Sequence, residues 1–451
     1  MYFKRIFSKG LAHYSYMVGD GNEIAVIDPR RDVQVYIDEA AKENKRITHI
    51  FETHRNEDII SGSIELSEAT GAEVHISKYE NLEYVYGNKI GEEDVFEMGN
   101  LKIVPIHTPG HTKGHLSYLV KVKGNNFAVF TGDCLFYGDI GRTDFYGEDY
   151  LEEMTGKMYD SIYNKLFKLG DEVAVYPAHG PGSACGGSID SREVSTIGYE
   201  RKHNDAVKAD SKEEFIEKNG YMRMKPPYFE YIEVANIKGA EKLGNAVKLN
   251  PVSISEIDKD DWNSIIDIRP ANSHIAKRIP KTVNLHQAVL SGYLGWMKCQ
   301  DEEIYLLSDG IDYESLEEMY WSLRRMGYDN IKGILGNGSI HSMMTQNFQF
   351  EKLSEVSPSE YLDYMKENSE NAVTIDVRKE KEMSEEDNVI NRINLPLETL
   401  SDSLDKVPEG KKLFTVCNSG NKATVALSVL KAAGIEASVI YGGTIALNKL
   451  K

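Results

Sequence analysis

The sequence predicts an α/β protein with one large N-terminal domain followed by two copies of a smaller unit. Three observations predict this class: apolar runs alternate with helical segments in the first half, landmarks recur in the second half, and 451 residues exceed the roughly 100–200 residues of one domain. Hydrophobic residues make up 41% of the chain and charged residues 27%, a balance typical of folded proteins. Several packed cores are therefore expected.

Six apolar runs in the first half are predicted strands that end in polar or glycine-rich turns. They are "EIAVIDP" (23–29), "ITHIFETH" (47–54), "AEVHIS" (72–77), "LKIVPIHTPGH" (101–111), "NFAVFTGD" (126–133) and "EVAVYPAHG" (172–180). Helical candidates such as "VQVYIDEAAKEN" lie between them. We expect a layered α/β domain over residues 1–245, with polar groups collected at one end of a sheet.

The second half contains an internal repeat. "IDIR" (266–269) recurs as "IDVR", "VNL" as "INL", "IYLL" as "LFTV" and "ILGNG" as "VIYGG", at offsets of 106 to 110 residues. The repeat predicts two α/β domains, at 251–350 and 355–451, with the first linker in "KLGNAVKLNPVS" (242–253).

The composition excludes several classes of partner and location. Asp and Glu number 71 against 52 Lys and Arg, and the net charge of −19 would repel nucleic acid and anionic membranes. No apolar run has the length of a signal peptide core or of a membrane span, so we expect a cytoplasmic protein. Four scattered cysteines are too few for a disulfide framework and are interpreted as thiols.

Five residues at predicted strand ends can form one metal-binding constellation. They are His54, Asp58, His111, Asp133 and His179. Imidazole and carboxylate ligands that converge in a cleft suit a first-row metal such as zinc or iron.

The motifs "TH..ED", "TPGHTKGH", "FTGD" and "YPAHG", in this order, resemble the metallo-β-lactamase fold, which implies an αββα sandwich over residues 1–245. That family usually carries an H-x-H-x-D-H loop, where this chain has His54, Asn56, Asp58 and Ile59. Asn56 removes a ligand of the first metal and Ile59 a ligand of the second. A two-metal hydrolase needs both sets to activate a bridging water, so a dinuclear centre is not expected.

His54, His111 and Asp133 remain, the two-histidine, one-carboxylate set of non-haem Fe(II) enzymes. This set and "GRTDF" (141–145) resemble the persulfide dioxygenase branch of the fold, which implies one Fe(II) per chain, with zinc as the alternative. Asp58 and His179 then orient ligands or water. Asn56 either fills space or hydrogen-bonds a substrate or oxygen ligand.

Further residues near these motifs have open roles. Arg142 is predicted either to anchor an anionic substrate or to pair internally with a residue such as Asp144. Cys185 lies in the glycine-rich loop "HGPGSACGG". It is a candidate thiol at the entrance of the metal site, where it would bind sulfane sulfur or react with a substrate, and the alternative is a loop thiol without a role. His107 and His115 are expected to be structural or to support the metal ligands, and Cys134 is expected in the core.

The last copy contains "LFTVCNSGNKATVALSVLKAAGI", which predicts a strand, a short loop headed by Cys417, and a helix. Backbone N–H groups of residues 418–422 and the helix N-terminus would favour a thiolate or persulfide. With "IDVR", "INLP" and "YGG", the pattern resembles the rhodanese sulfurtransferase domain, whose loop cysteine carries sulfane sulfur. The resemblance implies substrate binding by the loop residues Asn418, Ser419, Gly420, Asn421 and Lys422, the last replacing a frequent arginine.

The middle copy lacks a cysteine in this loop. The position equivalent to Cys417 is Ser308 when counted from the strand, or Gly310 when counted from the helix-ending glycine. Neither has sulfur chemistry, so this copy is interpreted as a silent rhodanese homologue that serves as scaffold or interface. A homo-oligomer is expected.

From end to end the chain resembles the persulfide dioxygenase–sulfurtransferase fusions of sulfide detoxification. The resemblance implies that iron and O₂ oxidise a small-molecule thiol persulfide to sulfite, and that Cys417 transfers sulfur from a second persulfide to sulfite, which gives thiosulfate. The alternatives are a hydroxyacylglutathione-type thioester hydrolase and a metal-free sulfur-relay protein. The sequence leaves open which thiol carries the persulfide and whether sulfite passes within or between chains.

Overall fold

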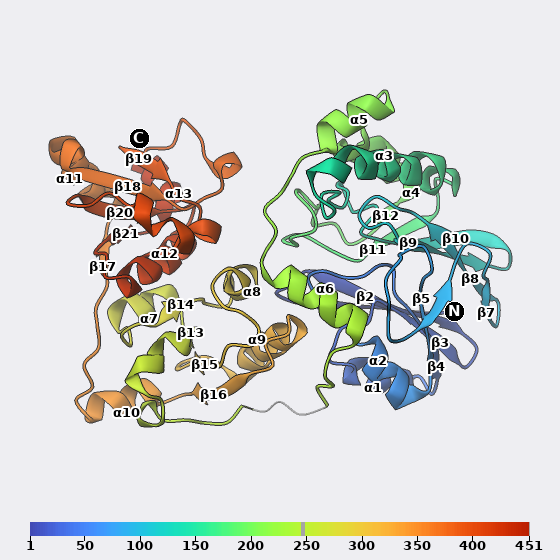
Figure 1. Ribbon diagram of the computed structural model, residues 1–451, viewed down its shortest axis with the longest axis horizontal. Coiled ribbons are helices and arrows are strands. Elements are labelled where there is room, and N and C mark those ends of the chain that lie inside the picture. Colours follow the sequence, from blue (N-terminus) through green and yellow to red (C-terminus); the bar gives the residue numbers. More distant parts are fainter. Residues whose placement is uncertain (245–248, 451) are drawn as a thin grey trace. The chain divides into compact units, whose positions relative to one another are not determined.

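The computed structural model describes residues 1–244 and 249–450 (Figure 1). The predicted linker at 242–253 and the predicted domain ends at 245 and 451 therefore lie partly or wholly outside the described residues. The chain divides into two compact units, Met1–Ala246 with Trp321–Gly327, and Val247–Tyr320 with Tyr328–Lys451. The three predicted domain boundaries stay a prediction.

Two six-stranded sheets form the first unit. The first runs in the order β1-β2-β3-β4-β5-β6, and its strands are β1 (Tyr2–Ser8), β2 (His13–Asp20), β3 (Glu23–Ile27), β4 (Arg46–Phe51), β5 (Glu73–Ser77) and β6 (Asn88–Ile90). The second runs in the order β12-β11-β10-β9-β8-β7, and its strands are β7 (Phe96–Met98), β8 (Leu101–His107), β9 (Leu116–Val122), β10 (Asn125–Gly132), β11 (Ala174–Pro177) and β12 (Ser195–Thr196). The predicted strands thus belong to two sheets, not one.

Three hydrophobic clusters explain the layers of this unit. One joins the facing sides of the two sheets, where Phe51 of β4 packs in the same cluster as Tyr118 of β9 and Phe130 of β10. A second joins the first sheet to α1 (Gln34–Lys42) and α2 (Ser63–Thr70). A third joins the second sheet to α3 (Glu148–Asn164) and α5 (Lys212–Asn219). The order is helix, sheet, sheet, helix, as the metallo-β-lactamase resemblance implied.

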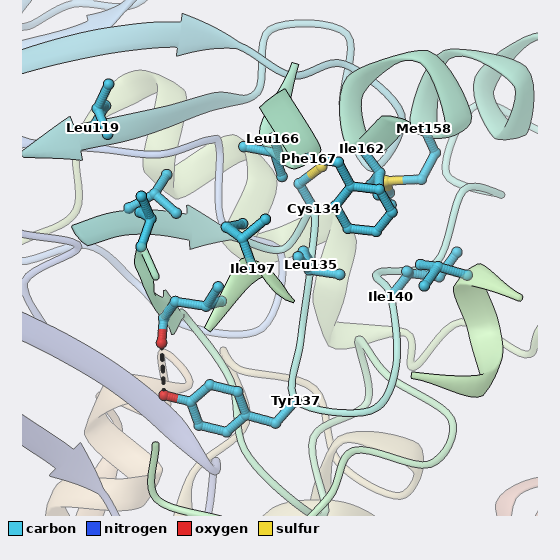
Figure 2. Packing of buried hydrophobic residues seen from close by; sticks show 14 of the residues in the cluster. Leu119, Cys134, Leu135, Tyr137, Ile140, Met158, Ile162, Leu166, Phe167 and Ile197 are labelled. Atoms are coloured by element: carbon cyan, nitrogen blue, oxygen red, sulfur yellow. Dashed lines mark hydrogen bonds between the residues drawn. The ribbon is translucent and has the colours of Figure 1, made fainter. Parts of the chain in front are cut away.

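Figure 2 shows the third cluster, where Met158 and Ile162 of α3 share a buried core with Leu119 of β9. Cys134 is fully buried in this core, as predicted, and burial raises the pKa of its thiol. The Tyr137 hydroxyl donates to the carbonyl of Val175, 2.9 Å away, so the loop after β10 is tied to β11. This packing fixes the strand end that carries Asp133.

The second unit contains two all-parallel sheets. The first has the order β14-β13-β15-β16, with β13 (Ile265–Asp267), β14 (Val283–Asn284), β15 (Ile304–Leu307) and β16 (Ile331–Leu335). The second has the order β19-β18-β20-β21-β17, with β17 (Ser354–Val356), β18 (Ala372–Asp376), β19 (Arg392–Asn394), β20 (Lys412–Val416) and β21 (Ser438–Ile440). The four recurring landmarks of the sequence thus occupy equivalent strands of the two sheets.

The remaining helices connect or flank these sheets. They are α4 (Ile197–His203), α6 (Tyr228–Lys238), α7 (Ala271–Ala276), α8 (Leu290–Tyr293), α9 (Tyr313–Arg325), α10 (Ser339–Thr345), α11 (Pro358–Asn368), α12 (Asn421–Ala432) and α13 (Gly443–Leu447). Helix α12 contacts the first copy, because Ser428 accepts hydrogen bonds from the backbone N–H of Asn284 and from Arg278 at 3.2 and 3.3 Å. None of the described helices combines the length and apolarity that a membrane span needs.

Candidate functional site

The predicted metal ligands meet at strand ends of both sheets of the first unit. His54 follows β4 of the first sheet, whereas His111 and Asp133 follow β8 and β10 of the second. One ligand atom from each of these three residues lies within 4.8 Å of the other two, and all three side chains are buried. The structure therefore brings the predicted triad together across two sheets.

Hydrogen bonds fix which nitrogen of each histidine faces the centre. His54 Nδ1 lies 2.8 Å from the hydroxyl of Thr53, which donates to Asp28 at 2.9 Å and so leaves its lone pairs for the histidine N–H. His111 Nδ1 lies 2.9 Å from the carbonyl of Arg142, an acceptor only. Both histidines thus carry a proton on Nδ1 and offer Nε2 to the centre.

The surroundings of Asp133 fit a bound cation. Its Oδ1 accepts a hydrogen bond from His179 at 2.8 Å, while its buried Oδ2 has no hydrogen-bond partner among the described residues. This free oxygen lies 3.4 Å from Nε2 of His111 and 4.0 Å from Nε2 of His54. A buried carboxylate oxygen without a partner is costly, and a metal ion beside two imidazole nitrogens would compensate it. The donor set fits a first-row divalent metal.

His179 lies between two carboxylates and not directly in the triad. Its Nδ1 contacts Asp133, and its Nε2 lies 3.0 Å from Oδ2 of Asp58. Burial lowers the pKa of His179, but the charges of Asp133 and Asp58 outweigh it and raise the pKa well above its usual range. The predicted orienting residues Asp58 and His179 therefore form an ion pair that holds Asp133.

Glu57 is a residue of this centre that the sequence did not reveal. Its Oε2 lies 3.3 Å from Nε2 of His111 and 3.7 Å from Nε2 of His54, and its side chain is fully buried. Burial raises the pKa of this carboxyl. The charged residue before Asp58 was a visible signal, but spacing alone does not say which way a side chain in an irregular loop points.

Asn56 and Ile59 belong to the same loop as His54. Both are buried, and their carbonyls accept hydrogen bonds from the Asn236 side chain of α6 at 2.8 and 2.9 Å. Asn56 Oδ1 is buried without a hydrogen-bond partner among the described residues. Hydrogen bonds from Asn236 of α6 therefore anchor the loop. Both predicted roles of Asn56 stay open: it either fills space or hydrogen-bonds a substrate or oxygen ligand.

His107 and His115 have the structural surroundings expected for them. His115 accepts the backbone N–H of Asp133 through Nε2 at 3.0 Å and lies 2.9 Å from the hydroxyl of Thr108. Burial lowers its pKa to about 3, so it is neutral at physiological pH. His107 contacts the carbonyl of Lys113 and stacks on Tyr79 with a centroid distance of 3.9 Å.

Arg142 makes the internal ion pair that was the alternative to substrate binding. Its guanidinium donates to both oxygens of Asp144 at 2.6 and 2.7 Å, and to the carbonyls of Arg223 and Met224. The side chain is 3% exposed. Substrate anchoring by Arg142 stays a prediction, although its hydrogen bonds go to the protein.

Cys185 lies at the centre but is fully buried. Its sulfur belongs to a group with Glu57 and His111, and to another with Asp58 and His179, each with ligand atoms within 4.8 Å. Burial, followed by the charge of Asp58, raises the pKa of the thiol well above its usual range. The glycine-rich loop thus brings the thiol beside the candidate metal ligands, and its catalytic role stays a prediction.

The Cys417 loop of the second unit surrounds its sulfur with backbone donors. The N–H groups of Gly420 and Ala423 point at Sγ from 3.2 and 3.4 Å, and the residue is 2% exposed. Gly420 has a φ of 95°, a left-handed conformation that glycine adopts without strain. Helix α12 begins at Asn421, so its positive end lies beside the sulfur. Of the two donors, Gly420 lies within the predicted range 418–422 and Ala423 one residue beyond it.

The other predicted loop residues have different surroundings. Asn418 accepts a hydrogen bond from Arg378 at 3.0 Å, and Ser419 is exposed. Lys422 pairs with Glu382 at 3.0 Å and lies over the ring of Tyr293 of α8, with 5.6 Å to its centroid. Substrate binding by these residues stays a prediction.

The equivalent loop of the middle copy makes different hydrogen bonds. Asp309 accepts the N–H of Ile340 at 2.6 Å and that of Gly338 at 3.3 Å, and the N–H of Gly310 donates to Asn337. A carboxylate therefore takes the backbone donors of a neighbouring loop. By contrast, both copies contain an equivalent Asp–Arg ion pair. Arg269 binds Asp267, and Arg378 binds Asp376, each through two nitrogens.

Comparisons with known proteins identify the first unit. Residues 9–179 match the metallo-beta-lactamase superfamily. A cytoplasmic hydroxyacylglutathione hydrolase from Arabidopsis thaliana is 33% identical over 174 residues, which cover 37% of this chain and 63% of that protein. The mitochondrial persulfide dioxygenase of Bos taurus is 27% identical over 245 residues, which cover 52% of this chain and 87% of that protein. The chain thus spans less than two thirds of the hydrolase and most of the dioxygenase.

A solved structure extends the likeness further along the chain. The crystal structure of a metallo-beta-lactamase from Staphylococcus aureus subsp. aureus COL has a TM-score of 0.66 and 28% sequence identity, and the match covers 74% of this chain and 99% of that one. With the fold and the buried donor set, these findings show that the N-terminal part of the chain is a metallo-beta-lactamase domain, with homologues among both persulfide dioxygenases and hydroxyacylglutathione hydrolases.

Proposed function

We propose that the first unit is a non-haem Fe(II) persulfide dioxygenase and that the second unit transfers sulfane sulfur through Cys417. One observation carries the first part: the free Oδ2 of Asp133 faces the Nε2 atoms of His54 and His111, while Asn56 and Ile59 supply no second metal set. His54, His111 and Asp133 would hold one ion. Bound iron supplies open coordination positions for a thiolate sulfur and O₂ together.

The chain's own residues prepare this site for an anionic persulfide. Thr53 and the carbonyl of Arg142 hold the two imidazoles in one tautomer, and the Asp58–His179 pair holds Asp133. Burial of all these groups keeps bulk water away from the centre. The overall reaction converts one persulfide anion, one O₂ and one water into one thiol, one sulfite dianion and one proton.

The second step uses Cys417 and the backbone N–H groups around its sulfur. The thiolate of Cys417 attacks the outer sulfur of a second persulfide, a thiol leaves, and the new cysteine persulfide passes its outer sulfur to sulfite to give thiosulfate. The N–H groups of Gly420 and Ala423 stabilise the negative sulfur at each stage. Sulfide detoxification, assembly into homo-oligomers through the middle domain and a cytoplasmic location are part of the same proposal.

A second candidate is a thioester hydrolase of the hydroxyacylglutathione class. The 33% identity to the Arabidopsis thaliana hydrolase favours it. The buried Ile59 argues against it, because a bridging hydroxide between two metals needs ligands that an alkyl side chain does not offer. A metal-free sulfur relay is disfavoured by the intact donor set of His54, His111 and Asp133.

Metal analysis of the purified full chain, combined with O₂ uptake on a low-molecular-weight persulfide and hydrolysis of a glutathione thioester, distinguishes these candidates. The proposal predicts about one iron per chain, O₂ uptake, and no thioester cleavage. Zinc with thioester cleavage would favour the hydrolase instead. A chain that binds no metal and takes up no O₂ would favour the sulfur relay.

A further inference from the structure

The side chain of Glu57 contacts both histidines of the candidate metal centre. Its Oε2 lies 3.3 Å from Nε2 of His111 and 3.7 Å from Nε2 of His54, similar to the 3.4 and 4.0 Å that separate these nitrogens from Oδ2 of Asp133. Two carboxylate oxygens thus approach the same pair of imidazole nitrogens. The side chain of Glu57 is fully buried.

A hydrogen bond within the protein does not account well for this position. The Nδ1 proton of His111 is used by the carbonyl of Arg142, so a hydrogen bond between Nε2 and Glu57 needs an additional proton, either on the imidazole or on the carboxyl group. Oε1 of Glu57 has no hydrogen-bond partner among the described residues, and Arg55 is 3.9 Å away and shared with Glu233. One divalent cation between the two carboxylates and the two Nε2 atoms would satisfy all four groups.

We propose that Glu57 is a fourth protein ligand of this metal, so that the centre holds its ion through two histidines and two carboxylates. The inference rests on the proposed metal centre, and it adds a ligand that the histidine-rich loop motif of the fold does not contain. The loop loses an imidazole at Asn56 and gains a carboxylate one residue later.

The fourth ligand has two consequences for the choice of metal and substrate. In a six-coordinate Fe(II) centre it leaves two positions, which suffice for a persulfide sulfur and O₂. In a four-coordinate zinc centre it fills the last position, and catalytic zinc needs that position open for water. Glu57 therefore makes the same loop suited to a six-coordinate metal and unsuited to zinc hydrolysis.

The test uses the metal-free full chain titrated with Co(II), whose visible absorption reports its ligands and coordination number. Glu57→Gln and Glu57→Ala are compared with Glu52→Gln, a matched control in which a buried glutamate near the same loop hydrogen-bonds Ser61 and Tyr86 instead. We expect both Glu57 variants to weaken Co(II) binding by about tenfold or more and to change the absorption bands. The control should keep its Co(II) affinity within about twofold of wild type and leave the absorption bands unchanged.

Two outcomes would overturn the inference. Unchanged affinity in Glu57→Gln would show that the carboxylate does not bind the metal, and weaker affinity with unchanged absorption bands would show that it acts by charge alone. Circular dichroism of the metal-free variants controls for folding. O₂ uptake by the iron-loaded wild type is measured separately: its absence would contradict the dioxygenase proposal but leave the ligand assignment standing.

Discussion

The candidate metal centre of the first unit and the Cys417 loop of the second are built in opposite ways. The candidate metal centre gathers ionisable side chains from loops after β4, β8, β10 and β11, and ligand atoms of His54, His111 and Asp133 lie within 4.8 Å of one another. The Cys417 loop uses seven consecutive residues, 417–423, whose backbone dipoles surround one sulfur without a metal. The first site therefore depends on long-range packing of side chains, whereas the second depends on local backbone geometry.

We expect that a substitution that inactivates one site leaves the activity of the other site intact. Cys417→Ser should abolish sulfur transfer, because a serine hydroxyl forms no persulfide, while O₂ uptake by the first unit stays within about twofold of wild type. Sulfur transfer from a persulfide to a small acceptor measures the first quantity. Cys299→Ser is the matched control, an exposed thiol outside the loop that should leave both activities unchanged. Loss of O₂ uptake in Cys417→Ser would show that the sites are not separable.

The converse variant is His111→Ala. Removing one imidazole ligand should weaken iron binding by more than about 100-fold and abolish O₂ uptake, with sulfur transfer by Cys417 retained. Iron content after dialysis gives the first result. His107→Ala, which removes a half-buried histidine stacked on Tyr79, should keep its iron. An iron-replete His111→Ala protein would contradict the ligand assignment.

Removal of the metal should destabilise the first unit and not the second. With free metal about a thousandfold above its dissociation constant, binding stabilises the folded first unit by about 4 kcal/mol, and a chelator removes this contribution. Hydrogen exchange resolved by peptide should show faster exchange near β4, β8 and β10, with α12 unchanged. Equal protection of both units with and without chelator would argue against a metal-dependent fold.

Acid should also affect the first unit through His115. Its folded pKa of about 3 is below the unfolded value of about 6.5, so the stability that its neutral form provides is complete above pH 6.5 and falls as the pH drops below it. Between pH 7 and pH 5 the expected loss is about 2 kcal/mol. Urea unfolding of the metal-free chain measures it, and His115→Gln, which keeps an acceptor for Asp133 N–H but cannot ionise, should flatten the slope. An unchanged slope in this variant would exclude His115 as the cause.

The smallest effect is expected at Gly420. An added Cβ would meet the N–H of Gly442 at 3.4 Å, which is ordinary contact, but the left-handed φ of 95° would cost an alanine about 1 kcal/mol. Gly420→Ala should therefore slow sulfur transfer by less than about tenfold, with stability lowered slightly. A complete loss of transfer would mean that the loop tolerates no relaxation at all.

The same contrast explains what the sequence could predict. The Cys417 loop is contiguous, so the strand, the loop and the helix could be predicted from one stretch of residues. Only the Ala423 donor fell outside the expected range. The five-residue constellation was predicted because strand ends collect polar residues, and the family resemblance then selected His54, His111 and Asp133 from it. Its division between two sheets and the position of Glu57 depend on tertiary packing, which local pattern does not encode. Arg142 shows the same limit, since its partners Arg223 and Met224 lie about 80 residues away.

The most direct test of the two-site account is the yield of sulfite and thiosulfate per O₂ consumed, measured with a low-molecular-weight persulfide for the full chain and for Cys417→Ser. The account predicts that the full chain releases thiosulfate, whereas the variant consumes O₂ at a similar rate and releases sulfite. An unchanged thiosulfate yield in Cys417→Ser would contradict the coupling, and a full chain that consumes no O₂ while it holds iron would contradict the dioxygenase assignment itself.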